Sequence, residues 1–509
     1  MKWIAAEDLL SFRRCRRQPY LRHFGLQEQQ SSPSDFLLQL RQGRKQQRQA
    51  LQTNAPGIDV GAAYTQAWPE LYARVLHTLE LMEAGDNRIY GGVLCHPLNL
   101  PGQPLLVSCP DVLVRSPLPD CGTVGIASTI HPRHRHWTYQ PADVRTGKRV
   151  KPGYALVLAL HAEVLQLLWG HTSESAIAIL RDNKWRTVNL TAARQQARQL
   201  LREYVAAMSA DSLPDVYVTR SRCNLCTWQE HCRDLARQQH PLTLLPGVTA
   251  TAYAALQEVG LIAVDTLAEV SPEAIQHLPG IGLTAARRLV RQARATATQA
   301  ALPARAFSLP RSPIELYFDI EAEPQQNVSF LLGVLAVNRQ HPDSQFYPHL
   351  AETPADEAAG WAAFVQLTQR YPSAPIYHFH AFEVHACRQL AEQYGTPRAT
   401  LQQILKRMVD LHEIARECVV MPVESYSLKH VAQWLGFRWR QANAGGAQAV
   451  YWYTQWLQTG DRSFLEAAAI YNEDDCRATY HLKRWLEQWQ AKHYPDRPSD
   501  YMTCKISAS

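Results

Sequence analysis

The chain has 509 residues, too many for one hydrophobic core, and its length suggests about three domains. Hydrophobic residues make up 46% and charged residues 19%, proportions that exclude a disordered tail and a fibre. The net charge of +6 is compatible with a polyanionic partner but does not establish one. The N-terminal residues show no secretory signal, and the longest apolar run, 154–170, contains His161 and Glu163 and predicts a buried helix instead of a membrane span. We therefore expect a cytoplasmic protein without a membrane partner.

Basic residues gather near the N-terminus, where the arginines are Arg13, Arg14, Arg16, Arg17 and Arg22. The stretch 131–151 is also rich in Arg, Lys and His. Such runs are usually solvated faces, so charge alone leaves contact with nucleic acid about as probable as not. Composition divides the chain further into three segments, which we predict to be domains over 1–238, 243–300 and 312–495.

Four cysteines frame the first segment. Cys223, Cys226 and Cys232 form a C-x2-C-x5-C run, a spacing that usually holds a metal, and Cys15 is the candidate for the fourth ligand. One early cysteine followed by such a run resembles the iron–sulfur staple of RecB, AddB and Cas-four-type nucleases. The resemblance implies a [4Fe–4S] cluster that ties the two ends of the nuclease domain together, with zinc as the alternative.

The same resemblance implies a PD-(D/E)-x-K nuclease core between the cysteines. Such a core needs an acid on one strand, an acid-x-Lys on the next, and usually an upstream His. Asp111 fits the first strand and Asp143 the second, but Arg145 stands where the lysine is expected. An always-charged guanidinium is a poor substitute for a lysine that must share a proton. We therefore expect a degenerate nuclease fold, catalytically inactive and kept for binding nucleic acid; cleavage by Asp111 and Asp143 is the disfavoured alternative.

The middle segment contains the run HLPGIGLTAARRLV at 277–290, which resembles a helix–hairpin–helix motif. Its turn exposes backbone N–H groups at the start of a helix, where they can hold a phosphate. The residues predicted to bind nucleic acid are Gly280, Gly282, Arg287 and Arg288. The run LPGVT at 245–249 resembles a degenerate first copy. The alternative is a plain helical hairpin that contacts another protein.

After a predicted proline-containing linker over 301–313, strands alternate with helices to the end of the chain. The run 314–321 predicts a strand, and because alternate side chains of a strand share a face, Asp319 and Glu321 project together. Two neighbouring carboxylates repel each other, an arrangement that a divalent cation between them stabilises. The next apolar run, 328–337, predicts the second strand of a hairpin.

The helical pattern over 467–486 places Tyr471 and Asp475 on one apolar stripe, four residues apart. Asp474 lies about 100° round the helix, so we expect it to be solvated and Asp475 to be the ligand. A carboxylate on the inward stripe needs a partner, because burying it unpaired is costly. A metal shared with the two strand acids would supply one.

Three short motifs carry a resemblance in this segment: DIE at 319–321, FE at 382–383 and YNEDD at 471–475. Together they resemble the DEDD exonucleases of the ribonuclease-H-like superfamily, over about 314–490. Carried over by position, the catalytic set is Asp319, Glu321, Glu383, Asp410, Tyr471 and Asp475. The resemblance makes Asp319, Glu321 and Asp475 the metal ligands and has Tyr471 orient the attacking water. The second motif offers Glu383 where an Asp is usual, so Asp410 is kept as the alternative fourth acid.

The chemistry that this resemblance implies uses two Mg²⁺ or Mn²⁺ ions roughly 4 Å apart. One lowers the pKa of a bound water to make the nucleophile, and the other stabilises the departing 3′ oxygen. The expected reaction is 3′→5′ removal of nucleotides from single-stranded DNA or RNA.

The whole chain resembles a bacterial family of RecB-like nucleases with a YprB-type C-terminal domain, and SYSLKHVAQWLGF at 425–437 is typical of that domain. The expected fold class is α/β multidomain: a degenerate PD-(D/E)XK nuclease fold, a small all-α helix–hairpin–helix domain, and a ribonuclease-H-like α/β domain with a mixed sheet. The family implies nuclease action in nucleic-acid processing or repair, sometimes beside a helicase. The competing hypothesis is an inactive nucleic-acid-binding scaffold that works with a helicase.

Overall fold

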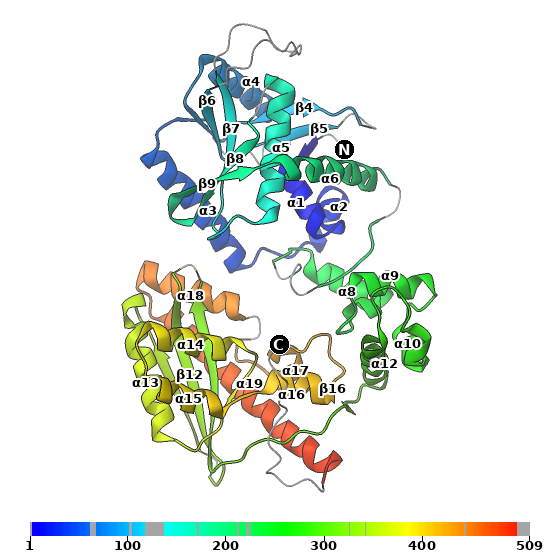
Figure 1. The fold of residues 1–509 in the computed structure, drawn as a ribbon, viewed down its shortest axis with the longest axis vertical. Coiled ribbons are helices and arrows are strands. Elements are labelled where there is room, and N and C mark those ends of the chain that lie inside the picture. The colour runs from blue at the N-terminus through cyan, green and yellow to red at the C-terminus, as the bar shows by residue number, and fades with distance from the viewer. Residues whose placement is uncertain are drawn as a thin grey trace. The chain divides into compact units, whose positions relative to one another are not determined.

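The computed structural model describes residues 3–61, 68–100, 104–117, 137–170, 173–210, 213–219, 223, 225–324, 326–341, 343–441 and 444–495. Contacts divide the chain into two compact units, Met1–Arg233 and Asp234–Ser509. Both units mix helices with mixed sheets (Figure 1), so the α/β class is confirmed. The division into three domains stays a prediction.

The first unit is built on a six-stranded sheet with the strand order β2-β3-β6-β7-β8-β9. Its strands are β2 (Ile58–Asp59), β3 (Arg88–Tyr90), β6 (Val112–Pro117), β7 (Trp137–Val144), β8 (Ser175–Leu180) and β9 (Lys184–Asn189). The central pair β6/β7 is antiparallel, and β7/β8 is parallel. A smaller sheet has the order β1-β5-β4, with β1 (Trp3–Ala5), β5 (Leu105–Ser108) and β4 (Leu94–Pro97).

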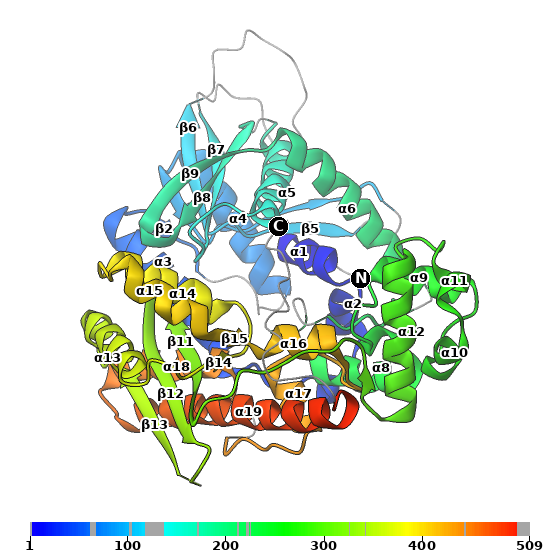
Figure 2. The same cartoon turned by 60° about the horizontal axis from the view of Figure 1, so that its bottom comes forward.

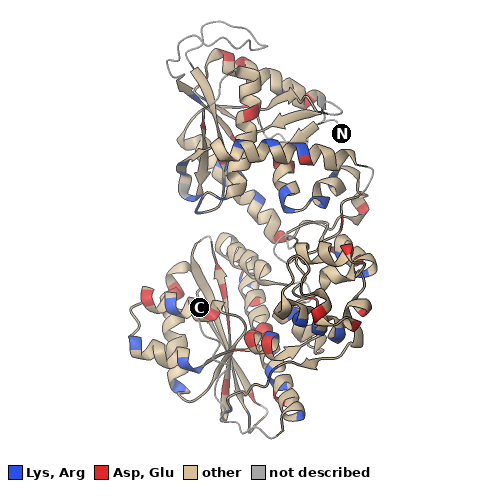
Figure 3. Ribbon diagram, turned by 45° about the vertical axis from the view of Figure 1, so that its right-hand side comes forward, with Lys and Arg blue, Asp and Glu red and all other residues tan. Residues whose placement is uncertain are grey.

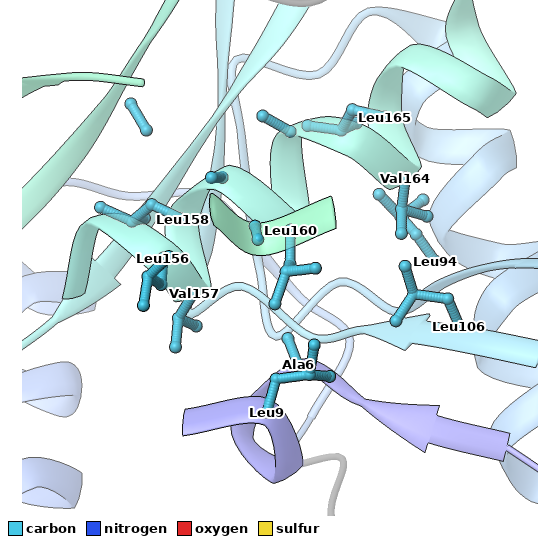
Figure 4. Packing of buried hydrophobic residues seen from close by; sticks show 14 of the residues in the cluster. Ala6, Leu9, Leu94, Leu106, Leu156, Val157, Leu158, Leu160, Val164 and Leu165 are labelled. Atoms are coloured by element: carbon cyan, nitrogen blue, oxygen red, sulfur yellow. The ribbon is translucent and has the colours of Figure 1, made fainter. Parts of the chain in front are cut away.

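Helix α5 (Pro152–Trp169) is the core helix of the first unit. The other long helices here are α1 (Ala6–Arg14), α2 (Arg17–Phe24), α3 (Asp35–Asn54), α4 (Trp68–Ala84) and α6 (Thr191–Ser209). By length and composition α5 could cross a membrane, but 61% of it is buried inside the protein. Figure 4 shows the reason: Leu160 points toward Leu9 of α1, and Val164 lies beside Leu94 of β4. The predicted buried helix is confirmed.

The second unit contains a five-stranded sheet with the order β13-β12-β11-β14-β15. Its strands are β11 (Ile314–Glu323), β12 (Val328–Asn338), β13 (Ser344–Leu350), β14 (Ile376–His378) and β15 (Met408–Asp410). β11 and β12 are antiparallel, so the predicted hairpin is confirmed, while β14 and β15 are parallel to β11 and to each other. The odd-numbered and even-numbered residues of β11 face opposite sides of this sheet.

Helices cover both faces of the five-stranded sheet (Figure 2). On one face lie α13 (Glu357–Arg370), α14 (Phe382–Gln393) and α15 (Arg398–Arg407), packed on the even-numbered residues of β11 such as Phe318. On the other face lie α16 (Leu411–Cys418), α17 (Leu428–Trp434), α18 (Gly446–Thr459) and α19 (Ser463–His493). The long helix α19 therefore faces the side that carries Tyr317, Asp319 and Glu321.

The segment 301–313, expected to be a linker, is instead part of the packed structure. β10 (Leu302–Pro303) pairs with β16 (Val419–Val420), and Phe307 and Leu309 are buried in the core against α16 and α19. The predicted linker packs on this unit because its apolar side chains have a hydrophobic surface to cover. Before this segment lie the short helices α9 (Ala250–Glu258), α10 (Val264–Glu269), α11 (Pro272–Ile275) and α12 (Leu283–Thr298).

Candidate active site

Three predicted acids converge where β11 faces α19. Asp319 and Glu321 lie two residues apart on β11, and Asp475 lies on α19. One carboxylate oxygen from each lies within 4.8 Å of the other two. The alternation of side chains along the strand and the apolar spacing of the helix predicted that these acids lie together, although Asp475 is more than 150 residues from the other two in sequence. Oxygen ligands at this spacing suit a hard divalent cation such as Mg²⁺ or Mn²⁺.

The protonation of these carboxylates is strongly perturbed. Burial raises the pKa of Asp319 and Glu321 well above the ordinary range, and the charge of Asp475 raises both further. Burial likewise raises the pKa of Asp475 to about 7, against the opposing effect of hydrogen bonds from Trp439 and Tyr471. Carboxylates that resist ionisation because they are buried together are stabilised in the ionised form by a cation, so these residues fit a metal ion.

Two neutral side chains hold the acids in position. Asn472 donates its Nδ2 hydrogen to Oδ2 of Asp319 at 2.7 Å, and Trp439 donates Nε1–H to Oδ1 of Asp475 at 2.7 Å. Gly333, the partner of Asp319 on β12, makes room for Asn472, because a Cβ there would lie 1.6 Å from its Oδ1. Sequence reasoning missed both positioning residues. The spacing of three between Asn472 and Asp475 was an available signal, whereas Trp439 had none nearby.

The two candidates for a fourth acid have different surroundings. Glu383, in the first turn of α14, is buried, and its Oε2 has no hydrogen-bond partner among the described residues. That oxygen lies 3.6 Å from Nδ1 of His378, and the charge of Glu383 raises the pKa of Asp319 and Glu321. Glu383 therefore lies close enough to act on both strand acids electrostatically.

Asp410 serves a structural role at the start of α16. Its Oδ1 accepts backbone hydrogen bonds from His412 (2.9 Å) and Glu413 (3.4 Å), which caps the helix, and from His380 (2.9 Å). The last of these fixes a residue with a left-handed backbone, since φ of His380 is 88°. Burial raises the pKa of Glu383, His378 opposes this effect, and the charge of Asp410 raises that pKa further.

Asp474 is not solvated, contrary to expectation. It is 3% exposed and accepts hydrogen bonds from the backbone N–H and Nε of Arg440, both at 2.8 Å. Arg440 also reaches Glu473 at 2.8 Å. The prediction failed because the chain after α17 folds over α19 and covers this face as well. Asp474 thus has a cation of its own, which separates its role from that of Asp475.

The first unit also brings its predicted acids together, but with arginines. Arg145 donates Nη2–H to Oδ2 of the buried Asp143 at 2.6 Å, and Arg44 donates to Oδ2 of Asp111 at 2.7 Å. Although burial opposes ionisation, Arg145 and then His161 hold the pKa of Asp143 below its ordinary range. Side chains of the protein therefore already neutralise this site, and its residues do not fit a divalent metal.

The four predicted cysteine ligands line one pocket of the first unit: Cys15, Cys223, Cys226 and Cys232. Burial raises the pKa of Cys232 to about 11, while the neighbouring Arg17 lowers it. Among the described residues, the one group of possible ligand atoms that converges within 4.8 Å is that of Asp319, Glu321 and Asp475, so a metal group at the four cysteines stays a prediction. The choice between [4Fe–4S] and zinc stays a prediction.

The predicted phosphate-binding turn lies before α12. Gly280 has a φ of +77°, and Gly282 precedes the helix without a side-chain cap, so the first N–H groups of α12 are not bound by a capping side chain. Arg287 and Arg288 are exposed, and Arg288 lies 4.0 Å from Glu417. The degenerate copy differs, since Thr249 caps α9 through the N–H of Ala252 at 3.1 Å. Phosphate binding here stays a prediction.

Comparison with known families agrees with the geometry of the second unit. The family model of the ribonuclease H superfamily matches residues 316–487, from β11 to α19, and this range contains every acid of the candidate site. A search among curated proteins finds no match to the chain. Members of this superfamily are generally nucleases that use divalent metals and act on nucleic acids. The segment 316–487 is thus a ribonuclease-H-like domain.

Proposed function

We propose that this chain is a two-metal-dependent 3′→5′ exonuclease that acts on single-stranded DNA or RNA in nucleic-acid processing or repair. One observation carries the proposal: the carboxylates of Asp319, Glu321 and Asp475 converge within 4.8 Å, with Glu321 buried and the other two half-buried. The hydrogen bonds that hold Asp319 and Asp475 come from neutral side chains, not from arginines as in the first unit. Lys429 lowers the pKa of Asp475 against the effect of burial, yet that pKa stays at about 7, so a bound cation would stabilise the ionised form of these acids.

In this proposal Asp319, Glu321 and Asp475 hold Mg²⁺ or Mn²⁺, and Glu383 completes the ligand set. When bound, the ions supply a water of lowered pKa and stabilise charge on the departing 3′ oxygen. Tyr471 hydrogen-bonds Asp475, and burial raises its pKa well above 10, as does the charge of Asp475. Its hydroxyl therefore keeps its proton at neutral pH and orients the attacking water as a neutral group instead of acting as the base.

The first unit has a supporting role in this proposal. We infer that its cysteines hold a [4Fe–4S] cluster, with zinc as the alternative, and that its arginine-paired acids do not cut. The specific observation in favour of an inactive first unit is the pairing of Asp111 with Arg44 and of Asp143 with Arg145. If the second site were inactive as well, the chain would be a nucleic-acid-binding scaffold for a helicase, which is the alternative function.

The test is degradation of 5′-labelled single-stranded DNA and RNA with Mg²⁺ or Mn²⁺. We expect a ladder that shortens from the 3′ end and stops at a blocked 3′ terminus. Asp319→Asn should abolish it, whereas Glu392→Gln, an exposed glutamate on α14, and Asp111→Asn should leave it unchanged. Absence of cleavage by folded, metal-loaded wild type would leave the scaffold function, and loss of cleavage in Asp111→Asn would assign the chemistry to the first unit.

A further inference from the structure

A pocket of about 410 Å³ opens along helix α6 in the first unit, and none of its lining residues belongs to either acidic site. Its lining residues are Glu174, Thr191, Arg194, Gln195, Arg198 and Arg202. The three arginines follow one another at intervals of four, so they share one face of the helix and lie about 6 Å apart along its axis. Lys and Arg positions recur along the helices of this unit in Figure 3.

Half-buried and exposed partners hold two of these arginines in place. Glu163 of α5 binds Arg198 through both carboxylate oxygens, at 2.9 Å to Nε and 3.1 Å to Nη2, and lies 3.7 Å from Nε of Arg194. Arg194 also donates to the carbonyl of Ser173 at 2.9 Å and to Gln166 at 3.2 Å. The guanidinium groups are therefore oriented before any ligand arrives, which lowers the entropic cost of binding.

Hydrogen-bond donors in the pocket remain available. Arg198 is 57% exposed, and its Nη1 makes no hydrogen bond to a described residue. Arg202 is exposed and has neither a hydrogen bond nor an ion pair with any residue that the structure describes. The pocket is lined by three arginines and Glu174, and Glu163 pairs with two of the arginines, so positive charge is in excess. The pocket begins at the N-terminus of α6, whose dipole adds positive potential.

We propose that this pocket binds the phosphodiester backbone of single-stranded nucleic acid and holds the strand on the first unit. Guanidinium groups are the preferred side-chain donors to phosphate oxygens. The three arginines span about 12 Å of the helix, a length over which a strand presents several phosphates, since a duplex strand has one per about 3.4 Å of axis. The inference rests on the proposed action on single strands and gives the first unit its part in it.

The experiment measures binding of a fluorescent single-stranded oligonucleotide to the full chain by anisotropy, over a series of salt concentrations in EDTA. The variant is Arg198→Gln/Arg202→Gln. The control, Lys184→Gln/Arg186→Gln, removes the same charge from exposed positions of β9. Two lost phosphate contacts should reduce the slope of log K against log salt by about 1.4, and the control should change it far less. Equal slopes for the two variants would overturn the proposal.

A second binding measurement distinguishes a nucleic-acid strand from a free nucleotide as the ligand of the pocket. Binding of a nucleoside 5′-monophosphate should be far weaker than binding of the strand, because it offers one phosphate instead of several. A mononucleotide that binds as tightly as the strand, and is lost in the variant, would assign the pocket to a free nucleotide instead. EDTA prevents cleavage, so weaker strand binding by the variant supports the pocket even if wild type proves unable to cut. Unchanged circular dichroism and melting of the variant exclude misfolding.

Discussion

Divalent metal should stabilise the second unit, and more strongly at about pH 8 than at about pH 5.5. In the metal-free protein the pKa of Asp475 is about 7 against an ordinary value of 3.8, and the pKa values of Asp319 and Glu321 are raised too. At a pH between the ordinary and the raised pKa values of these acids, the folded state therefore holds more protons than the unfolded chain. Stability without metal must then fall as pH rises from about 4 toward 7. Metal reverses this loss because it binds the ionised carboxylates.

The size of the effect follows from mass action. A metal concentration about 100 times the Kd stabilises the folded state by about 2.7 kcal/mol. In a domain of about 150–250 residues, each kcal/mol moves the melting temperature by about 2–4 °C, so the expected increase is about 5–10 °C. At about pH 5.5 protons compete with the metal for the same carboxylate oxygens. The increase in melting temperature on adding metal should therefore be much smaller at this pH.

The assay is thermal unfolding of the full chain, followed by tryptophan fluorescence in EDTA and in Mn²⁺ at both pH values. Asp319→Asn should melt at a higher temperature than wild type in EDTA at about pH 8, because one buried negative charge is gone. It should also lose the response to Mn²⁺, whereas Glu392→Gln should keep both properties of wild type. An equal Mn²⁺ response in Asp319→Asn, or a larger wild-type response at the lower pH, would refute the assignment of these acids as ligands.

Three shorter predictions test other parts of the structure. Lys483→Met should lower the free energy of unfolding by about 3–5 kcal/mol, measured in urea, because the buried Lys483 binds both oxygens of Glu315 at 2.6 and 2.7 Å; Lys483→Met/Glu315→Gln should recover part of the loss. Gly333→Ala should cost about 1–3 kcal/mol by overpacking against Asn472 and also slow cleavage, so an active, equally stable variant would contradict the packing. Cys226→Ser should remove bound iron in elemental analysis; retained iron would exclude Cys226 as a ligand.

The fold and the acids of the second unit could be predicted from the sequence because each depends on a local period. Alternation in 314–321 places Asp319 and Glu321 on one face, and the spacing in 467–486 places Asp475 on the inward stripe. The prediction that Asp474 is solvated failed because the exposure of this residue depends on a contact that is distant in sequence. Whether that face is solvated depends on Arg440, which lies 34 residues away and reaches it through a loop with no periodic signal.

In the first unit the motif identified the acids but not what neutralises them. Asp143 and Arg145 are two residues apart, so their pairing was within reach of a local argument. Arg44, which pairs with Asp111, is 67 residues distant on α3, and Glu7 of α1 adds a carboxylate 3.3 Å from Arg145. A motif gives residue types at set spacings, whereas the charge balance of a site depends on which helices pack against it.

The fourth acid of the proposed metal site can be decided by comparing Glu383→Gln with Asp410→Asn. Glu383 is 3% exposed, its Oε2 accepts no hydrogen bond from a described residue, and its charge acts on Asp319 and Glu321. Removal of its charge should therefore weaken Mn²⁺ binding and slow cleavage at least tenfold, the equivalent of about 1.4 kcal/mol.

Asp410→Asn should behave differently because Oδ1 of Asp410 caps α16 and fixes His380. An amide oxygen can keep these contacts at some loss of strength, so the variant should lose about 0.5–2 kcal/mol of stability while its affinity for Mn²⁺ stays near that of wild type. Glu392→Gln on α14 controls for loss of an acid from the same helix as Glu383. If Asp410→Asn weakens Mn²⁺ binding and Glu383→Gln does not, the fourth ligand is Asp410. The choice of Glu383 on the basis of its burial would then be wrong. The comparison is informative because Glu383 is buried, whereas Asp410 is half-buried and its Oδ1 already accepts three backbone hydrogen bonds.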